Sequence, residues 1–310
     1  ALSNASTIVD EVHRRVLAFG FLDGAVHEMR LDGAPEWHLL RCVGPAPRTS
    51  GLGSAVLDPV RNRVLWFGGN CDGIYTCPGA DVSVLDLAGA VPTWSQLAVT
   101  GVRPPTRFGQ AAVFDVESDR MIVYGGKGGS PLDHWHWLGD VWALSFIGAP
   151  RWTEITPAGP TPGERTDMAV AFDPARNRML IHGGFRFVED PTLPDGGITT
   201  VFDDVWALSL GSNPMWSAVV TDGAKPPARW AHTAAYDPIG DNLLIANGIG
   251  ASYASLGDAW QLPLSGGPLW SPIYAPGGPS QTYGRASVVD PARARWFLFG
   301  GYSIARKIET

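Results

Sequence analysis

Lysine is scarce in this sequence, and so is positive charge in general. Only three lysines occur, and 23 Lys and Arg residues face 30 Asp and Glu residues, which leaves a formal net charge of −7 at pH 7. A nucleic-acid-binding surface is strongly basic, so this balance argues against a nucleic-acid partner. The arginines used in place of lysine either reflect genomic base composition or are placed for the planar, bidentate contacts that guanidinium groups make.

Long hydrophobic runs are absent too. No apolar run approaches the roughly 20 residues that a membrane-spanning helix needs, so we expect no membrane span. Residues 1–5 do not have the composition of a signal peptide, and any such leader would have been removed.

Cysteine is rare, with three residues in the chain. Cys71 and Cys77 lie six residues apart around a glycine. We expect a disulfide that closes this loop, which would place the protein outside the cytoplasm or make it secreted. Cys42 is left over as a buried thiol or a packing residue. Two neighbouring cysteines are too few for a structural zinc site, which takes four ligands.

What the sequence does have is a repeat. An Asp that ends one apolar run is followed eleven residues later by the second residue of a Gly-Gly pair, with Asn-Gly in one copy. The pairs are Asp58/Gly69, Asp115/Gly126, Asp173/Gly184, Asp237/Gly248 and Asp290/Gly301. A degenerate first copy runs from Asp10 to Phe21, in which Phe21 replaces the second glycine. Self-similarity with a period near fifty residues is typical of β-propellers.

The copies supply the apolar runs of four strands. Two runs flank a polar turn, as at Asp173-Pro174, and therefore predict a hairpin. A third run begins at an Asp-x-Trp sequence, and a fourth is marked by a single tryptophan. The third-run copies are Asp140 to Trp142, Asp204 to Trp206 and Asp258 to Trp260, and the fourth-run residues are Trp37, Trp94, Trp152, Trp216 and Trp270. Four strands make one propeller blade, and the tryptophans are large enough to fill the wedge between neighbouring blades.

We therefore predict an all-β fold, a six-bladed β-propeller of four-stranded antiparallel blades that forms a single domain. The expected blades cover about residues 5–40, 48–97, 107–155, 165–219, 229–273 and 283–308. Only five fourth-strand tryptophans occur, and few residues follow Gly301. The last blade is therefore expected to be incomplete or closed by the N-terminal residues 1–6. A seven-bladed ring and a fragment of a longer repeat array are the alternatives.

These motifs resemble those of the kelch-repeat propellers. The matching features are the Gly-Gly at the end of the second strand, the Asp-x-Trp start of the third and the Trp of the fourth. They recur through nearly the whole chain, from about Ala5 to Tyr302. The resemblance implies the fold, but propellers host unrelated activities. In kelch proteins, arginines ahead of the first strand often take part in recognising acidic peptides.

Arginines also precede the first strand here, and we take them as candidate ligand-binding residues. The loops that carry them should open on one face, around the mouth of the central channel, and function concentrates in such loops. The five residues are Arg48, Arg107, Arg165, Arg229 and Arg285. A ring of guanidinium groups would suit carboxylates or phosphates. The alternative is that each arginine only ties its own loop to a neighbouring carbonyl group or Asp.

The loops that leave the second strand should open on the same face, and they differ in length. Those of the third and fourth blades are the longest, and their aromatic rings could stack on sugars or hold peptide anchors. The alternative is that they fold back as lids. The candidates are Trp135, Trp137, Phe185, Arg186 and Phe187, together with Trp230 beside Arg229.

Metal-binding and catalytic residues are not identifiable. His134 and His136 should point to one side of an extended segment, but no third ligand can be named beyond the neighbouring Asp133. The acidic residues of the fourth blade's loop lack the spacing of a calcium loop. No Ser/His/Asp set is apparent, nor the Tyr and His ligands of a copper oxidase. We expect no cofactor and assign no catalytic residue.

The function that we predict is a monomeric interaction module. It would recognise an acidic peptide, a protein loop or a glycan through the arginine-bearing face. The first alternative is a carbohydrate-active enzyme, oxidase or epimerase-like, with its site at the channel mouth. The second is a repeat scaffold without a dedicated ligand.

Overall fold

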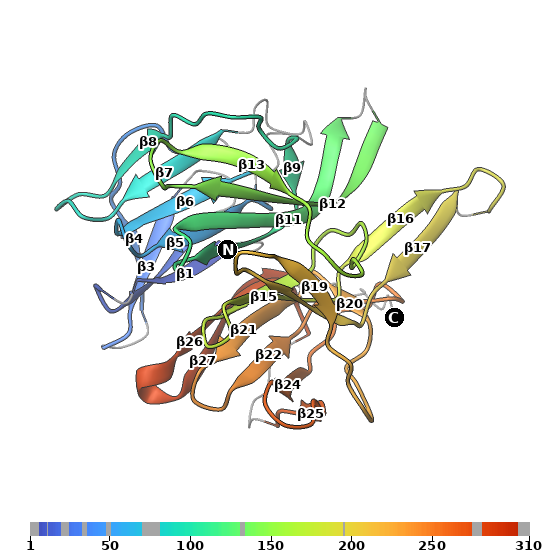
Figure 1. Ribbon diagram of the computed structural model, residues 1–310. Helices are drawn as coiled ribbons and strands as arrows, with labels where there is room; N and C mark the ends of the chain where they lie inside the picture. The colour runs from blue at the N-terminus through green and yellow to red at the C-terminus, as the bar shows by residue number, and fades with distance from the viewer. Residues whose placement is uncertain are drawn as a thin grey trace, which may run out of the picture.

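Short antiparallel strands arranged in a ring make up almost the whole fold (Figure 1). The structure is a computed structural model that describes residues 6–10, 12–19, 25–32, 36–47, 51–69, 81–130, 134–194, 196–274 and 281–302. The helix found in these ranges is the short 3-10 turn η1 (Pro291–Arg293). None of the described residues forms a helix long and apolar enough to cross a membrane.

Five sheets each contain a four-stranded blade, whose strands are ordered in space as they are along the chain, and in the third sheet the two-residue β9 (Arg107–Phe108) also pairs with the second strand. The first blade consists of β1 (Ser6–Asp10), β2 (Arg15–Phe19), β3 (Val26–Arg30) and β4 (Trp37–Leu40). The second consists of β5 (Ser54–Asp58), β6 (Arg63–Phe67), β7 (Val82–Asp86) and β8 (Thr93–Gln96). The third consists of β10 (Ala111–Asp115), β11 (Arg120–Ser130), β12 (His134–Ser145) and β13 (Arg151–Ile155). The fourth blade consists of β14 (Ala169–Asp173), β15 (Arg178–His182), β18 (Val205–Ser209) and β19 (Met215–Ala218). The fifth consists of β21 (Thr233–Asp237), β22 (Asn242–Ala246), β24 (Ala259–Pro263) and β25 (Ser271–Pro272). These sheets are the antiparallel propeller blades that the repeats predict.

The sixth sheet has two strands within the described residues, β26 (Tyr283–Asp290) and β27 (Arg295–Tyr302). Ser6 begins β1 and pairs with Phe19 in the first blade, so it does not supply an outer strand to the sixth. Residues 1–5 and 303–310 lie outside the described part of the chain. The described ring therefore contains five four-stranded blades and a two-stranded sixth.

The first strands of the six sheets close the ring. β1 lies beside β5, β5 beside β10, β10 beside β14, β14 beside β21, β21 beside β26, and β26 beside β1. At the last junction the Thr7 hydroxyl donates to the Ser287 carbonyl over 3.3 Å, and Arg295 donates to the Leu31 carbonyl over 3.1 Å. The six inner strands consequently surround one central channel.

The tryptophan of the fourth strand fills the space between two blades, as predicted. Trp94, Trp152, Trp216 and Trp270 are at most 4% exposed. Each packs on a ring at the end of the second strand of the preceding blade. The pairs are Phe19/Trp94, Phe67/Trp152, Tyr124/Trp216 and His182/Trp270, with ring centroids 6.2, 5.1, 4.8 and 5.5 Å apart. Contacts of this kind add to the large area that an aromatic ring buries.

The Asp that defines the repeat ends the first strand and anchors the hairpin turn. In five blades its carboxylate accepts a hydrogen bond from the arginine that begins the second strand. The pairs are Asp10/Arg15, Asp58/Arg63, Asp115/Arg120, Asp173/Arg178 and Asp290/Arg295, at 2.8 to 3.0 Å. This repeated Asp is therefore a structural residue at the end of the channel opposite the candidate loops.

The cysteines contribute little to the described structure. Cys71 and Cys77, and with them the predicted disulfide, lie outside the described residues. Cys42 is a free, half-buried thiol that packs against the hydrophobic cluster shared by the first and second blades. Burial raises the pKa of this thiol, as expected for a packing residue.

Candidate functional site

Three of the five candidate arginines are buried within the loop face. Arg107, Arg165 and Arg229 are at most 1% exposed. Each guanidinium group pairs bidentately with the Asp of the Asp-x-Trp sequence in its own blade. The pairs are Arg107/Asp140, Arg165/Asp204 and Arg229/Asp258, with shortest N–O distances of 2.7, 2.6 and 2.7 Å. Each Nη1 also donates to a backbone carbonyl at the end of the second strand.

These three ion pairs are electrostatically complete. Burial by itself would raise the pKa of the Asp carboxyls, but the hydrogen bonds and charges of the arginines lower it below the usual value. The indole N–H of the Trp two residues on donates to the same carboxylate. The three arginines therefore tie each loop to its own blade, which is the alternative stated above, and do not form the predicted ring of free guanidinium groups.

The other two candidate arginines do not share this position. The carbonyls of Arg107, Arg165 and Arg229 accept hydrogen bonds from the glycine that ends the preceding repeat motif, and in the sixth repeat Thr282 accepts the equivalent bond from Gly248. Arg285 lies in β26, three residues beyond Thr282, and its backbone pairs with that of Gly300 in β27. Arg48 lies outside the described residues. Among the described blades, the equivalent arginine thus occurs in three.

Two residues beyond this position, the backbone forms the mouth of the central channel. The residues are Leu52, Gly109, Asp167, Ala231 and Gly284, with φ between 50° and 64°. Each of the last four donates its N–H to the carbonyl oxygen of the one before it, over 2.8 or 2.9 Å. Because these backbone groups bond to one another, the channel mouth presents mainly side chains to a ligand.

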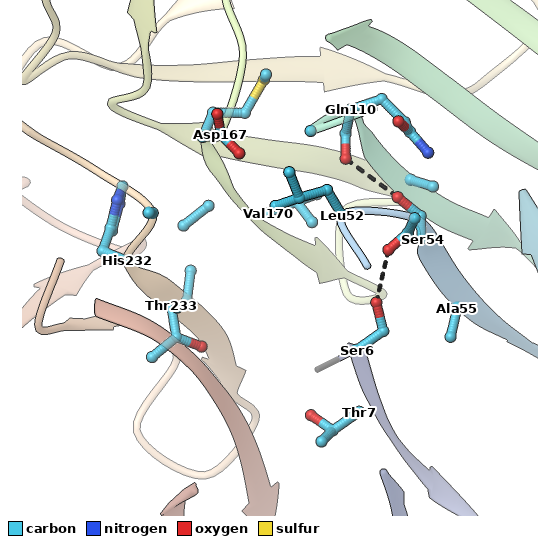
Figure 2. Close-up of a pocket in the computed structure, with 18 of the residues that line it drawn as sticks. Ser6, Thr7, Leu52, Ser54, Ala55, Gln110, Asp167, Val170, His232 and Thr233 are labelled. Carbon is cyan, nitrogen blue, oxygen red and sulfur yellow. Dashed lines mark hydrogen bonds between the residues drawn. The ribbon is translucent and has the colours of Figure 1, made fainter. Parts of the chain in front are cut away.

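The channel mouth opens into a cavity of about 240 Å³, which we call the channel-mouth cavity. Ser6 and Ser54 line it, and their hydroxyls donate to the carbonyls of Gly53 and Gln110 over 2.8 and 3.1 Å (Figure 2). Among the described residues that line the cavity, Asp167 is the one with an acidic side chain. Burial raises the pKa of the Asp167 carboxyl to about 7, against the opposing effects of the Thr166 hydroxyl and the Lys127 charge.

A second cavity lies between insertions of three blades. β11 and β12 continue past their blade, and β16 (Phe185–Glu189) and β17 (Gly197–Val201) form a separate hairpin that projects from the ring (Figure 1). Tyr253 follows β23 (Ile249–Gly250). The cavity measures about 530 Å³, and we call it the aromatic cleft. Its lining residues are Lys127, Trp137, Phe185, Phe187, Gly197, Thr199 and Tyr253.

The rings of the aromatic cleft hold one another in place. Trp137 meets Phe185 edge-on at 5.2 Å between centroids, and Phe185 lies 4.5 Å from Trp230. Trp230, from β20 (Arg229–Trp230), is in turn 6.5 Å from Tyr253. The Lys127 amine sits 4.9 Å above the Trp137 ring. Since Trp137, Phe185, Trp230 and Tyr253 pack on one another in series, the walls that they form are in place before any ligand arrives.

The structure brings together part of the predicted aromatic set. Phe185 and Trp230 are in contact, and Trp137 and Phe187 line the same cleft. Arg186 instead pairs with Glu164 over 3.0 Å on the exposed surface. Trp135 pairs with Gly129 in the backbone ladder, and its side chain lies outside the described structure.

Sequence reasoning missed Lys127, Thr199 and Tyr253. Lys127 could have been found as one of only three lysines in the chain. Thr199 and Tyr253 carry no sequence signal, because they join the cleft only when two insertions fold toward each other. Their hydroxyls lie 3.4 Å apart, which links the β16–β17 hairpin to the loop of the fifth blade.

No group of three His, Cys, Asp or Glu side chains in the described structure could hold a metal ion. His136 lies exposed on β12, and the side chain of His134 and the whole of Asp133 fall outside the description. Two acidic residues of the fourth blade's loop are held by basic side chains instead, because Asp203 pairs with Lys225 over 2.7 Å and Asp204 pairs with Arg165 over 2.6 Å.

Two buried histidines lie between the fourth and fifth blades. Nδ1 of His182 is 2.8 Å from Nε2 of His232, and both side chains are at most 7% exposed. Burial lowers the pKa of His182 to about 3, with further lowering by the Arg229 charge, and burial and the neighbouring His182 lower that of His232 well below its usual value. Both imidazoles are therefore neutral in the folded protein near neutral pH.

We expect these histidines to make the fold less stable as the pH falls from 7 to 5. The unfolded chain takes up protons below about 6.5 while the folded protein does not, which costs up to about 1.4 kcal/mol per pH unit for each imidazole. Asp167 acts with the opposite sign. Its carboxyl keeps its proton up to about pH 7 in the folded state, so it favours the folded state as the pH falls through the same range.

Urea unfolding at pH 5, 6 and 7 tests this expectation. His232→Gln should have a shallower pH dependence than the wild type, and Asp167→Asn a steeper one. Gln110 occupies the position equivalent to His232 in the third blade and donates to the Phe67 carbonyl over 2.8 Å, so glutamine is accepted there. His136→Gln, on the surface, is the matched control. An unchanged slope in His232→Gln would show that the pair does not titrate as described.

Comparisons with known proteins agree with this architecture. The model of the KLHDC2/KLHL20/DRC7 Kelch-repeats domain matches residues 20–246. Among similar proteins, putative adagio-like protein 2 of Oryza sativa subsp. japonica is 27% identical, over 79% of this chain and 37% of its own length. Adagio protein 3 of Arabidopsis thaliana is 29% identical over 56% of this chain and 25% of its own. The serine/threonine-protein phosphatase BSL2 of the same plant is 28% identical over 77% and 23%.

The chain spans 23 to 37% of the length of the three relatives, so what those whole proteins do does not transfer directly. A solved structure, "Structure of YjhT", superposes with a TM-score of 0.67 over 98% of this chain and 91% of the other. Its sequence identity of 14% shows a common fold and no more.

Proposed function

The chain belongs to the kelch-repeat family, and from that premise we propose that it is a protein-interaction module whose loop face binds an extended segment of a partner protein. An apolar or aromatic side chain of the partner enters the aromatic cleft. The observation that carries the proposal is the cleft itself, in which Trp137, Phe185 and Tyr253 from three blades meet around one cavity.

Size and composition of the cleft favour such an anchor. A cavity of about 530 Å³ accepts a large side chain, and ligand sites typically combine apolar walls with a few polar groups. Thr199 and Lys127 supply those groups here. Binding energy in protein interfaces concentrates in aromatic residues that fill such pockets. Because the rings pack on one another already, little side-chain freedom is lost when the partner binds.

The internal pairing of the arginines changes which partner charge is favoured. The prediction of an acidic peptide depends on free guanidinium groups, but Arg107, Arg165 and Arg229 already hold carboxylates of their own. The basic residue that lines the cleft is Lys127, and the chain as a whole carries a net charge of −7. The proposal therefore rests on the aromatic anchor and not on an acidic ligand.

Selection from a library of random dodecapeptides displayed on phage tests this function. We expect the wild type to enrich peptides that share an aromatic or large aliphatic residue, and Phe185→Ala to bind the synthesised peptides about 30-fold more weakly, as for a hot spot worth about 2 kcal/mol. Val188→Ala is the matched control. Val188 lies on the same strand, exposed and outside the cleft lining, so its variant should bind like the wild type.

Three outcomes would contradict the proposal. One is that no peptide family is enriched, and another is that Phe185→Ala and Val188→Ala bind the selected peptides equally well. The third is that immobilised glycans bind in a Phe185-dependent manner while peptides do not, which would assign the same rings to sugar stacking.

A further inference from the structure

Asp167 differs from the four other residues at the channel mouth. The equivalent positions hold Leu52, Gly109, Ala231 and Gly284, none of which has a polar side chain. Asp167 adopts this left-handed conformation with φ of 52°. Asp and Asn tolerate that conformation better than most residues with a side chain. The fold thus places a single carboxyl group in a ring of otherwise apolar positions.

The Asp167 carboxyl is also set apart by its partners. The buried Asp residues that end the first strands of the first, second and third blades each pair with an arginine, whereas Asp167 forms no salt bridge with any described residue. The Thr166 hydroxyl donates to the carbonyls of Phe108 and Gly109, and this hydroxyl and the charge of Lys127 only partly offset the effect of burial on the Asp167 pKa. His232 lines the same cavity from the next blade, and its neutral ring brings no charge.

We propose that the channel-mouth cavity is a subsite for a basic side chain of the partner, with a lysine-type ammonium group paired to Asp167. The inference rests on the proposed function in one respect only, that the loop face is the binding face. It adds a second feature to the recognised segment, a basic residue next to the apolar anchor.

Space and charge both suit an alkylammonium group. The cavity of about 240 Å³ has a smaller volume than the aromatic cleft, and the neighbours of Asp167 in the ring, Gly109 and Ala231, have little or no side chain to obstruct entry. Ser54 and Thr233 lie around the same opening (Figure 2). The net charge of −7 attracts basic ligands over long range.

Lys127 is the basic group whose charge acts on the Asp167 carboxyl. Its amine sits over Trp137 on the side of the aromatic cleft, and burial lowers its pKa while the charges of Asp167 and Glu189 oppose that effect. A bound ammonium group would be repelled by Lys127 and attracted by Asp167. The two residues therefore predict opposite effects of removing a charge, which makes the subsite testable with small probes.

Titration of n-butylammonium, followed through the alanine methyl resonances of Ala169, Ala231 and Ala234, tests the proposal. These residues line the channel-mouth cavity. At pH 8 we expect shifts at these methyl groups for the amine and none for n-butanol, which has the same shape without the charge. Asp167→Asn, which keeps the backbone conformation, should weaken binding at least about tenfold, and Lys127→Met should strengthen it.

The pH provides an independent readout. The ammonium group stays charged between pH 6 and 8, while the Asp167 carboxyl gains its charge across this range. His232 stays neutral throughout. Binding of n-butylammonium should therefore be about tenfold tighter at pH 8 than at pH 6 in the wild type, and independent of pH in Asp167→Asn.

Each alternative outcome overturns the subsite. Absence of shifts at 100-fold excess of amine, equal shifts with n-butanol, or equal binding by Asp167→Asn would show that the carboxyl does not receive a cation. The melting temperature of Asp167→Asn, expected at or above that of the wild type at pH 8, confirms that the variant is folded. If peptides still bind in a Phe185-dependent manner, the proposed function stands without the subsite. If the amine binds but peptides do not, the subsite stands and the proposed function fails.

Discussion

Arg229→Ala is expected to lower the free energy of unfolding by about 3 kcal/mol, one of the two largest effects that we predict. The guanidinium group donates to both oxygens of Asp258 over 2.7 Å and to the carbonyls of Pro227 and Asn247 over 3.0 Å. Removing one partner of a buried ion pair leaves the other charge without compensation, which costs about 3 to 5 kcal/mol. Asp258 is partly exposed to solvent, so we take the lower end of that range.

Chemical unfolding of Arg229→Ala, Arg229→Ala/Asp258→Ala and Arg103→Ala tests the expectation. The double variant should recover part of the lost stability, because it no longer leaves a carboxylate unpaired. Arg103 pairs with Asp81 on the surface, where both side chains are well exposed, and its loss should cost less than about 1 kcal/mol. If Arg229→Ala were as stable as Arg103→Ala, the arginine would be free for a ligand, as the sequence suggested.

Trp216→Ala is expected to cost about 3 to 5 kcal/mol, the usual range for a large aromatic side chain in a core. Trp216 is 1% exposed and packs across the blade boundary on Tyr124, 4.8 Å away between ring centroids. Met179 and Leu208 belong to the same core cluster. The loss opens a cavity between the third and fourth blades, where rigid sheets on both sides cannot move together to fill it.

The control for this prediction is the residue next to it. Met215 on the same strand is 49% exposed, so Met215→Ala should change the stability by less than about 0.5 kcal/mol. Thermal unfolding of both variants gives the comparison. If the Trp216→Ala and Met215→Ala proteins unfolded at the same temperature, the packing of the tryptophan between the third and fourth blades would not contribute to stability.

The arginines show how far sequence reasoning reaches. Arg107, Arg165 and Arg229 stand in a regular pattern, and a regular pattern fits both a shared structural bond and a shared ligand. Their partners Asp140, Asp204 and Asp258 begin the Asp-x-Trp sequences, about thirty to forty residues further on. Both halves of each pair were visible as motifs, yet only the folded blade shows that one motif binds the other.

The aromatic cleft shows the opposite case. The sequence predicts Phe185, in a long loop, and Trp230, beside Arg229, as candidates, and the two rings do meet, at 4.5 Å between centroids. Tyr253 completes the wall from a loop of ordinary appearance. Such a residue has no sequence signal, because its role depends on the direction in which the neighbouring β16–β17 hairpin leaves the ring.

The sequence by itself determined the blades. Turn residues, apolar runs, the buried Asp and the interblade tryptophan recur along the chain with a period of about fifty residues. Interactions within one repeat or with the next one fix the positions of these residues in the fold. Only the tertiary structure decided the candidate sites. Asp167 is one residue at a position that is glycine, alanine or leucine in the other described blades, and the aromatic cleft draws on insertions of three blades. The physical reason is that a repeat encodes its own sheet many times over, whereas a site at the channel mouth is assembled once, from residues that come together only when the ring has closed.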